Sequence, residues 1–233
     1  MLFVAEGVRS VEDLLNSSLE IRGVLTAPQL DGAPRGMQLR EKITRSGIEN
    51  TSVTELEFRS AAETESPQGV IAIGAIPERR LDSLGGRDFL RILVLDAVQD
   101  PGNVGTLVRT AAALGADATV ALPGTVDLWN AKVIRGAMGA MYNHHALHSS
   151  VEGLLGFIEA ERIELWGGDA GGKPVSEMTA PARMALAVGN EGAGLSSSLR
   201  ERVTQTVSLP ISASVDSLNV AVAAGILLYQ LRT

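Results

Sequence analysis

The hydrophobic pattern is most unusual at the C-terminus, where Val220–Leu231 carries no charged residue. A surface helix has one apolar stripe and one polar face, whereas this segment is apolar all round and too short to span a bilayer. It therefore predicts a helix buried on several sides, against the core, a partner subunit or both. The preceding Ser208–Asn219 is polar and contains Pro210, which predicts a loop. Ser217 and Asn219 then lie at the helix start, where backbone N–H groups have no intrahelical partner.

Upstream of this helix, strand and helix patterns alternate from residue 89 onward. Phe89–Leu95 is an almost continuous apolar run, as expected for a parallel strand that is covered on both faces. Further strands are predicted at Ala118–Leu122, Asn143–Leu147, Ile163–Gly167, Met184–Val188 and Thr206–Leu209. Helices are predicted at Thr106–Leu114, Asp127–Ile134, Val151–Glu161 and from Ser196 through Val203. This alternation predicts an α/β fold with a mostly parallel sheet.

The first part of the chain has shorter elements and reads as a separate small α/β domain over residues 1–76. Helices are predicted at Glu6–Ser17 and Met37–Arg45, the second followed by Gly47 as its terminating glycine. The other predicted elements are strands at Ile21–Thr26, Val53–Leu56 and Gly69–Gly74, a loop at Ala27–Gly36, and a short helix or turn at Glu57–Glu65. Residues 77–88 are polar and turn-rich, so we expect a linker there and a second domain at 89–233.

Composition describes a globular protein of 233 residues, with 45% hydrophobic and 20% charged residues. The chain has no cysteine, which rules out a disulfide framework and a cysteine-based metal site. Met1–Gly7 lacks the basic stretch and long apolar run of a signal peptide, and no segment approaches the length of a membrane helix. We therefore expect a cytoplasmic protein that does not enter a membrane.

The formal net charge of −7 argues against a non-specific nucleic-acid binder, whose affinity comes from neutralising phosphates. A local basic site remains compatible with that balance, because charge can be segregated along the chain. One basic cluster lies in the first fifty residues: Arg22, Arg35, Arg40, Lys42 and Arg45. The cluster is explained equally well by an RNA contact and by an ordinary solvated helix face.

Three predicted strands end in unusual loops, at Asp100–Gly105, Gly189–Leu195 and Leu209–Asn219. Ligands of open α/β sheets bind beyond the carboxyl ends of the strands, and glycine lets the backbone approach a ligand closely. Each loop alone is explained by a tight strand-to-helix turn. Three such loops in one domain predict a shared binding site.

Other candidate sites are weaker. Gly167–Pro174 follows a strand and fits G-x-x-x-x-G-K, but the next residue is Pro174 and not Ser or Thr. It therefore lacks the hydroxyl that holds Mg²⁺ in nucleotide-binding loops, and we interpret it as an ordinary loop. His144, His145 and His148 have no matching carboxylate pattern, so we interpret them as structural or surface residues and predict no metal.

Taken together, the three loops resemble the motifs of the SpoU (TrmH) family of RNA ribose 2′-O-methyltransferases, within the SPOUT class. Asp100–Gly105 followed by Arg109 and Gly115 resembles the first motif. Gly189–Leu195 resembles the second motif, and Leu209–Ile211 through Ser217–Val220 resembles the third. The N-terminal segments Phe3–Gly7 and Ser66–Val70 resemble the ribosomal-protein-like RNA-binding domain of many members.

The resemblance implies S-adenosylmethionine as the methyl donor, a C-terminal domain with a trefoil knot, and a homodimer with the last helix in the interface. It also implies roles for individual residues. Arg109 acts on the ribose 2′-hydroxyl beside an RNA phosphate and reaches the partner subunit's cofactor. The other implied catalytic residues are Asn103, Glu191, Ser217 and Asn219, although a purely structural role remains an alternative for Glu191 and Ser217. The implied cofactor-binding residues are Val188, Gly189, Asn190, Leu209, Ile211 and Leu218.

Three functions are compatible with these features. The presence of the N-terminal RNA-binding-like domain favours methylation of large-subunit (23S) rRNA. The first alternative is ribose methylation of tRNA, although such members often lack this domain and carry basic extensions. The second is a non-catalytic RNA-binding or ribosome-assembly protein, which the presence of Asn103, Arg109, Glu191, Ser217 and Asn219 disfavours.

Overall fold

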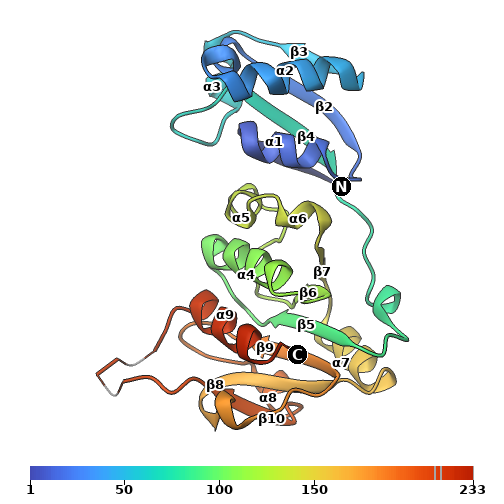
Figure 1. Ribbon diagram of the computed structural model, residues 1–233, viewed down its shortest axis with the longest axis vertical. Helices are drawn as coiled ribbons and strands as arrows, with labels where there is room; N and C mark the ends of the chain where they lie inside the picture. The colour runs from blue at the N-terminus through green and yellow to red at the C-terminus, as the bar shows by residue number, and fades with distance from the viewer. Residues whose placement is uncertain (213, 216, 233) are drawn as a thin grey trace. The chain divides into compact units, whose positions relative to one another are not determined.

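The computed structural model describes residues 1–212, 214–215 and 217–232 and divides the chain into two compact units (Figure 1). The first unit contains Met1–Glu78 together with Trp129–Asn143. The second contains Arg79–Leu128 and His144–Thr233. No helix among the described residues has the length and apolar character needed to cross a membrane.

The first unit has a four-stranded sheet in the order β1-β4-β2-β3. Its strands are β1 (Leu2–Glu6), β2 (Ile21–Thr26), β3 (Asn50–Ser52) and β4 (Val70–Ala75). Its helices are α1 (Val8–Leu15), η1 (Pro28–Gly32), α2 (Pro34–Ser46), α3 (Glu55–Ala61), α5 (Ala131–Ala137) and α6 (Ala140–Asn143). β4 pairs antiparallel with both β1 and β2, whereas β2 and β3 are parallel.

Aromatic packing explains why Trp129–Asn143 belongs to this unit. The Phe3 ring lies 4.7 Å from that of Trp129 and 5.9 Å from that of Tyr142, measured between centroids. Phe3 also crosses the neighbouring strand at Gly74, where a Cβ atom would lie 2.3 Å from the Phe3 ring. Only glycine leaves room for the ring there, because protein interiors are close-packed.

Most local predictions for this unit are confirmed, with three exceptions. The loop predicted at Ala27–Gly36 contains the helix η1 and the first residues of α2. Gly47 ends α2 in the left-handed region, at φ 71°, as predicted. The strand predicted at Val53–Leu56 is wrong, because Thr54 caps α3: its hydroxyl accepts from the Glu57 N–H at 3.3 Å, and its own N–H donates to the Glu57 carboxylate at 2.8 Å. β1 was not predicted, since its five residues are too few to show a clear period.

The basic cluster near the N-terminus is neutralised within the domain. Glu12 accepts from Arg35 at 2.7 Å and from Lys42 at 2.6 Å, which holds the pKa of its carboxyl below the usual range. The other three cations pair as Arg22–Glu20, Arg40–Asp31 and Arg45–Glu41, each at 3.0 Å or less. The cluster is therefore no uncompensated positive patch, and an RNA phosphate bound there would compete with these carboxylates.

The second unit has a six-stranded sheet in the order β10-β8-β9-β5-β6-β7, and every neighbouring pair is parallel. Its strands are β5 (Leu90–Leu95), β6 (Ala118–Ala121), β7 (His145–His148), β8 (Glu164–Pro174), β9 (Arg183–Val188) and β10 (Gln205–Ser208). Its helices are η2 (Leu81–Leu84), α4 (Pro101–Ala113), α7 (Val151–Ala160), η3 (Val175–Glu177), α8 (Ser197–Arg200) and α9 (Val220–Gln230). The predicted α/β fold with a parallel sheet is confirmed, and the trefoil knot stays a prediction.

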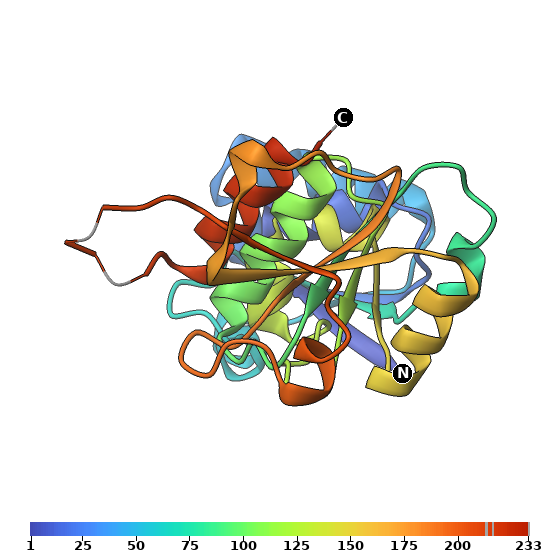
Figure 2. The same ribbon diagram turned by 90° about the horizontal axis from the view of Figure 1, so that it is seen from below.

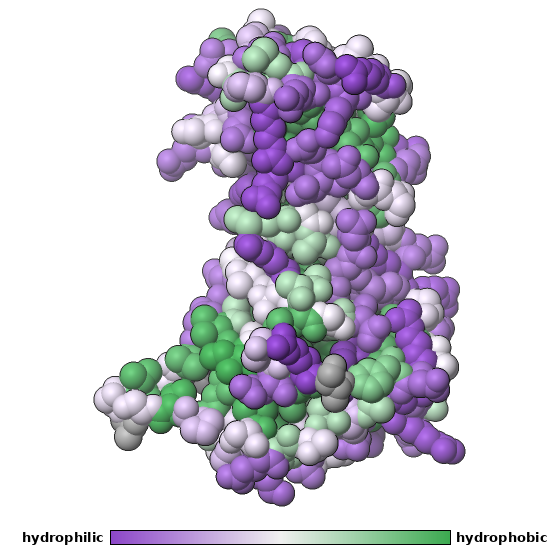
Figure 3. All heavy atoms as spheres, in the orientation of Figure 1, coloured by the Kyte–Doolittle hydropathy of each residue, from purple (hydrophilic) through white to green (hydrophobic). Residues whose placement is uncertain are grey.

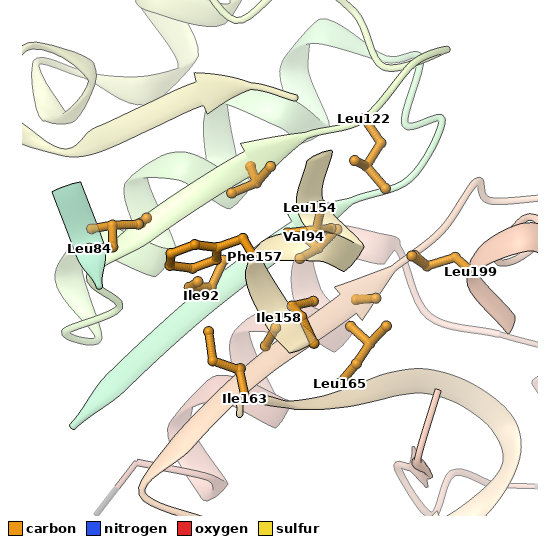
Figure 4. Close-up of a cluster of buried hydrophobic side chains, with 14 of the residues drawn as sticks. Leu84, Ile92, Val94, Leu122, Leu154, Phe157, Ile158, Ile163, Leu165 and Leu199 are labelled. Carbon is orange, nitrogen blue, oxygen red and sulfur yellow. The ribbon is translucent and has the colours of Figure 1, made fainter. Parts of the chain in front are cut away.

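The core lies on both faces of this sheet. Ile92 and Val94 of β5 pack under Leu154 and Phe157 of α7 (Figure 4). Helices α4 and α9 pack together on the other side of β5 (Figure 2). Leu84 of η2 is 1% exposed and joins the α7 cluster, so this part of the predicted linker is packed into the second unit.

Two further local predictions need correction, one for β8 in this unit and one for α5 in the first unit. Gly167–Pro174 is not a loop but part of β8, which pairs with β10 on both sides of an irregularity between Thr206 and Val207. A Cβ atom on Gly172 would lie 2.6 Å from the Thr206 backbone, so glycine is what lets the two chains approach. The helix predicted at Asp127–Ile134 begins only at Ala131, because the side chain of Asn130 caps it by accepting from the Lys132 N–H.

The three histidines contact different partners. His144 is buried, and its Nε2 lies 2.8 Å from the Thr119 hydroxyl. His145 Nε2 lies 3.2 Å from the Arg80 carbonyl, and His148 Nε2 lies 3.2 Å from the Asp127 carboxylate. Within the described residues, no three His, Asp or Glu side chains are grouped as metal ligands.

We expect His144 to make the protein acid-sensitive. Burial lowers the pKa of His144 to about 4, whereas the unfolded chain binds this proton near pH 6.5. Stability is therefore fully present above about pH 6.5 and falls as the pH drops toward 4, with a loss of about 2 kcal/mol between pH 8 and pH 5. Urea unfolding at several pH values should show a smaller acid loss for His144→Gln than for the native chain. His148→Gln, at a half-exposed ring, is the control, and equal acid losses in His144→Gln and the native chain would contradict the assignment.

Candidate active site

A cavity of about 380 Å³ lies at the carboxyl ends of β9 and β10, beside the middle of β8 and against α9. The predicted loops Gly189–Leu195 and Leu209–Asn219 both contribute to its wall. All six predicted cofactor residues line it: Val188, Gly189, Asn190, Leu209, Ile211 and Leu218. Ser217 and Glu191 line it as well.

The second loop is a narrow hairpin that only glycine permits. Asn190 and Gly194 exchange backbone hydrogen bonds of 3.0 and 2.9 Å. This closure brings Gly194 so near to Gly189 that a Cβ atom on Gly189 would lie 2.2 Å from the Gly194 carbonyl oxygen. The backbone of Gly189 therefore faces the cavity with no side chain in between.

A short hydrogen-bond chain joins the three predicted loop segments, although the first of them, Asp100–Gly105, is not a loop but the N-cap and first turn of α4. The Asn219 amide donates to the Asn103 amide oxygen at 2.8 Å, and the Asn103 amide donates to the Glu191 carboxylate at 2.7 Å. The Asn219 oxygen also accepts from the N–H groups of Ala221 and Val222, which caps α9. Three of the predicted catalytic residues are thus in contact, although their sequence separations reach 116 residues.

Arg109 has a different position. It is exposed on α4 and lines a groove between α4 and α9, together with Val222 and Tyr229 of α9. It is not among the residues that line the cofactor cavity of its own chain. Of the five predicted catalytic residues, Glu191 and Ser217 line the cavity. Asn103 and Asn219 are joined to it through Glu191, and Arg109 lies in the neighbouring groove.

Sequence reasoning missed part of the cavity wall. Gly168, Asp169 and Ala170 line the cavity from the irregular part of β8, which was interpreted as a loop without a function. Arg200 of α8 lines it too. The glycine-rich run after a strand is the signal in the sequence that could have found it, although this run does not fit the nucleotide-binding pattern.

The residues present fit S-adenosylmethionine. The volume falls within the range of about 300–1,000 Å³ typical of small-molecule sites. Among the described residues that line the cavity, the acids are Asp169 and Glu191 and the base is Arg200. Such a set complements a ligand with a sulfonium, an ammonium and a carboxylate. The glycine-walled hairpin offers backbone groups to hold an adenine ring.

Comparison with known proteins agrees with this geometry. A family model described as the SpoU rRNA Methylase family matches residues 91–229. The chain belongs to the SpoU rRNA methylase family. In this SpoU methylase, the matched region contains all three motifs. A second family model, described as an MRM3-like substrate binding domain, matches residues 1–72.

Several related proteins and solved structures match this SpoU methylase over nearly its full length. It is 35% identical to the Bacillus subtilis 23S rRNA (guanosine(2553)-2′-O)-methyltransferase RlmP, covering 99% of this chain and 88% of the relative. It is 30% identical to a Streptomyces viridochromogenes 23S rRNA (uridine(2479)-2′-O)-methyltransferase, covering 98% and 81%. The crystal structure of the SpoU methyltransferase AviRb from Streptomyces viridochromogenes, in complex with AdoMet, matches with a TM-score of 0.85 at 28% identity, covering 99% and 89%.

These matches confirm the family that the three motifs predicted. The chain is an RNA 2′-O-methyltransferase of the SpoU family, with S-adenosylmethionine as its cofactor. The individual roles predicted for the site residues stay predictions.

Proposed function

We propose that this SpoU methylase transfers a methyl group from S-adenosylmethionine to the ribose 2′-hydroxyl of a nucleotide in 23S rRNA. The observation that carries the proposal is the Asn219–Asn103–Glu191 chain at the rim of the glycine-walled cavity. It joins all three family motifs in one place, in a chain whose relatives are named as 23S rRNA 2′-O-methyltransferases. The protein is proposed to act in the cytoplasm.

S-adenosylmethionine supplies an electrophilic methyl group on a sulfonium, so the protein must orient the 2′-hydroxyl and ease the loss of its proton. We assign this task to Arg109. A guanidinium stays protonated at neutral pH, so Arg109 would not act as the base; it would bind the adjacent phosphate and stabilise the developing alkoxide while the 2′-hydroxyl proton passes to solvent water. The methyl carbon would leave the sulfonium as its bond to the 2′-oxygen forms, and S-adenosylhomocysteine would remain. Asn103 and Glu191 would fix the loops around the reacting groups, with Ser217 and Asn219 at the start of α9.

The first 76 residues are proposed to bind the RNA, and residues 89–233 to carry the cofactor and the chemistry, with 77–88 between them. The family-model match over residues 1–72 supports this division. Because the basic cluster there is internally paired, we expect recognition by shape and hydrogen bonding to contribute more than phosphate neutralisation.

The homodimer is proposed to form across the α4–α9 groove. α9 buries Ala224 and Leu228 but exposes Val222, Ile226 and Tyr229, which share one face of the helix. Apolar residues also gather over α9 in the space-filling view (Figure 3). A second copy placed there would cover this stripe, and it would bring Arg109, which lines the same groove, toward the cavity of its partner.

The dimer proposal predicts that Ile226→Asp gives a monomer. Burying one carboxylate per protomer in an apolar contact should weaken association by about 100-fold or more. Analytical ultracentrifugation at micromolar concentration measures this, with Leu56→Asp as the control at an exposed leucine of α3. A native chain that sediments as a monomer would contradict the proposal.

The function is tested with methyl-labelled S-adenosylmethionine and three substrates: 23S rRNA, 16S rRNA and tRNA. We expect label in 23S rRNA, at a nucleotide whose 3′ phosphodiester bond resists alkaline hydrolysis once its 2′-hydroxyl is methylated. Label in tRNA would identify the chain as a tRNA methyltransferase, and label in no RNA would favour a non-catalytic RNA-binding protein.

A further inference from the structure

A buried acid follows β5 directly, outside the predicted site. Asp96 is 3% exposed, and its carboxylate accepts a hydrogen bond of 2.7 Å from the backbone N–H of Ser196. Ser196 is the residue that follows the glycine-rich hairpin. Burying a carboxylate is costly unless its oxygens are hydrogen-bonded. Breaking the Asp96–Ser196 hydrogen bond would therefore destabilise the folded state.

The next residue holds the other end of the same hairpin. Ala97 has φ 57°, in the left-handed region, which is uncommon for a residue other than glycine. In that conformation its carbonyl oxygen accepts from the Asn190 amide at 3.2 Å. Gly124 leaves room for this turn, since a Cβ atom there would lie 3.1 Å from the Ala97 Cβ.

The Asn190 side chain completes the arrangement from inside the hairpin. Its amide oxygen accepts from the N–H groups of Gly192 and Ala193, at 2.9 and 3.1 Å. The Asn190 side chain thus donates to Ala97 and accepts from the hairpin backbone. The side chain therefore stabilises the shape of the loop that lines the cavity.

We propose that Asp96 is a positioning residue of the cofactor cavity, which fixes the Asn190–Ser196 hairpin from the end of β5. With the Ala97 carbonyl, it holds both ends of the hairpin to the two residues that follow β5. Glu191 lies within that hairpin, so the same contacts set its carboxylate against Asn103. The inference rests on the proposed function only in naming S-adenosylmethionine as the ligand of the cavity.

The first test needs no cofactor. Hydrogen exchange of the full chain reports the Ser196 amide directly, and loss of its acceptor in Asp96→Ala should speed exchange by about tenfold or more. Asp96→Asn keeps an oxygen in the same place, so exchange should stay within about threefold of the native rate. Equal acceleration in Asp96→Ala and Asp96→Asn would overturn the proposal, because the acceptor would then not be what matters.

The second test is calorimetry with S-adenosylmethionine. Asp96→Ala should weaken binding by about tenfold or more, whereas Asp96→Asn should restore it to within about threefold. Asp117→Ala is the matched control, because its carboxylate also accepts from a backbone N–H, that of Arg91 at 2.8 Å, and it does not line the cavity. Unchanged affinity in a folded Asp96→Ala would overturn the proposal.

Two further outcomes are informative. If Asp96→Ala does not fold, Asn190→Ala removes the second contact and should speed exchange at the Gly192 and Ala193 amides, while unchanged exchange there would overturn the proposal. If the native chain itself does not bind S-adenosylmethionine, the proposed function fails, yet the exchange of the Ser196 amide still decides the role of Asp96.

Discussion

Arg109→Ala should abolish methyl transfer while leaving S-adenosylmethionine binding nearly intact. Arg109 does not line the cavity of its own chain, and its proposed partners at the partner's cavity are the RNA phosphate and the 2′-oxygen, so its loss should change the affinity for the cofactor by less than about threefold. Removing the cation that stabilises the developing alkoxide should lower kcat by about 1,000-fold or more. Calorimetry and single-turnover methylation of 23S rRNA measure the two effects separately.

Two variants sharpen this prediction. Arg109→Lys keeps the charge but not the planar fork of donors, so it should recover only part of the activity. Arg87→Ala removes an arginine that pairs with Asp117, away from the cavity, and should leave kcat unchanged. Lost cofactor affinity in Arg109→Ala, together with lost activity, would contradict this division of roles.

Gly189→Ala should abolish cofactor binding for a purely steric reason. Its Cβ atom would lie 2.2 Å from the Gly194 carbonyl oxygen and 2.6 Å from the Leu195 nitrogen, both backbone atoms that cannot rotate away. The hairpin must therefore open, and we expect the affinity for S-adenosylmethionine to fall by about 100-fold and stability by about 2–3 kcal/mol.

Gly192→Ala is the control in the same hairpin. A Cβ atom on Gly192 would meet nothing closer than the Asn190 amide oxygen at 3.6 Å, which is an ordinary contact. This variant should bind the cofactor within about threefold of the native chain. Native-like binding by Gly189→Ala would show that the Gly189–Gly194 approach is not needed for the site.

Strong local signals made the parallel sheet and the position of the site predictable. Buried parallel strands read as apolar runs, and glycine, proline and asparagine between them show where the strands end. Because all the strands of such a sheet point the same way, their terminal loops meet at one edge. Asn103, Glu191 and Asn219 could therefore be expected together, and the structure joins them by hydrogen bonds of 2.7 and 2.8 Å.

Errors arose where distant residues decide the local conformation. Gly168–Ala170 reads as a loop by composition, but β10 pairs with the flanking backbone and draws it into β8. Val220–Leu231 is a different case: the sequence predicts burial against the core, a partner subunit or both, the single chain leaves Val222, Ile226 and Tyr229 exposed, and burial against a partner stays a prediction. No local pattern distinguishes burial against the same chain from burial against a second copy.

The amino-acid sequence alone determined the fold class, the order of the elements and the membership of three loops in one site, because these depend on periodicity and on residues that end strands. Only the tertiary structure decided which contacts shape the site. In the sequence, Asp96 is an ordinary residue after a strand. Its role becomes visible only in the structure, where the N–H of Ser196, a hundred residues away, lies 2.7 Å from its carboxylate. The place of Arg109 in the groove beside α9, away from the cavity of its own chain, also follows from packing, since sequence spacing does not say which helix α4 will contact.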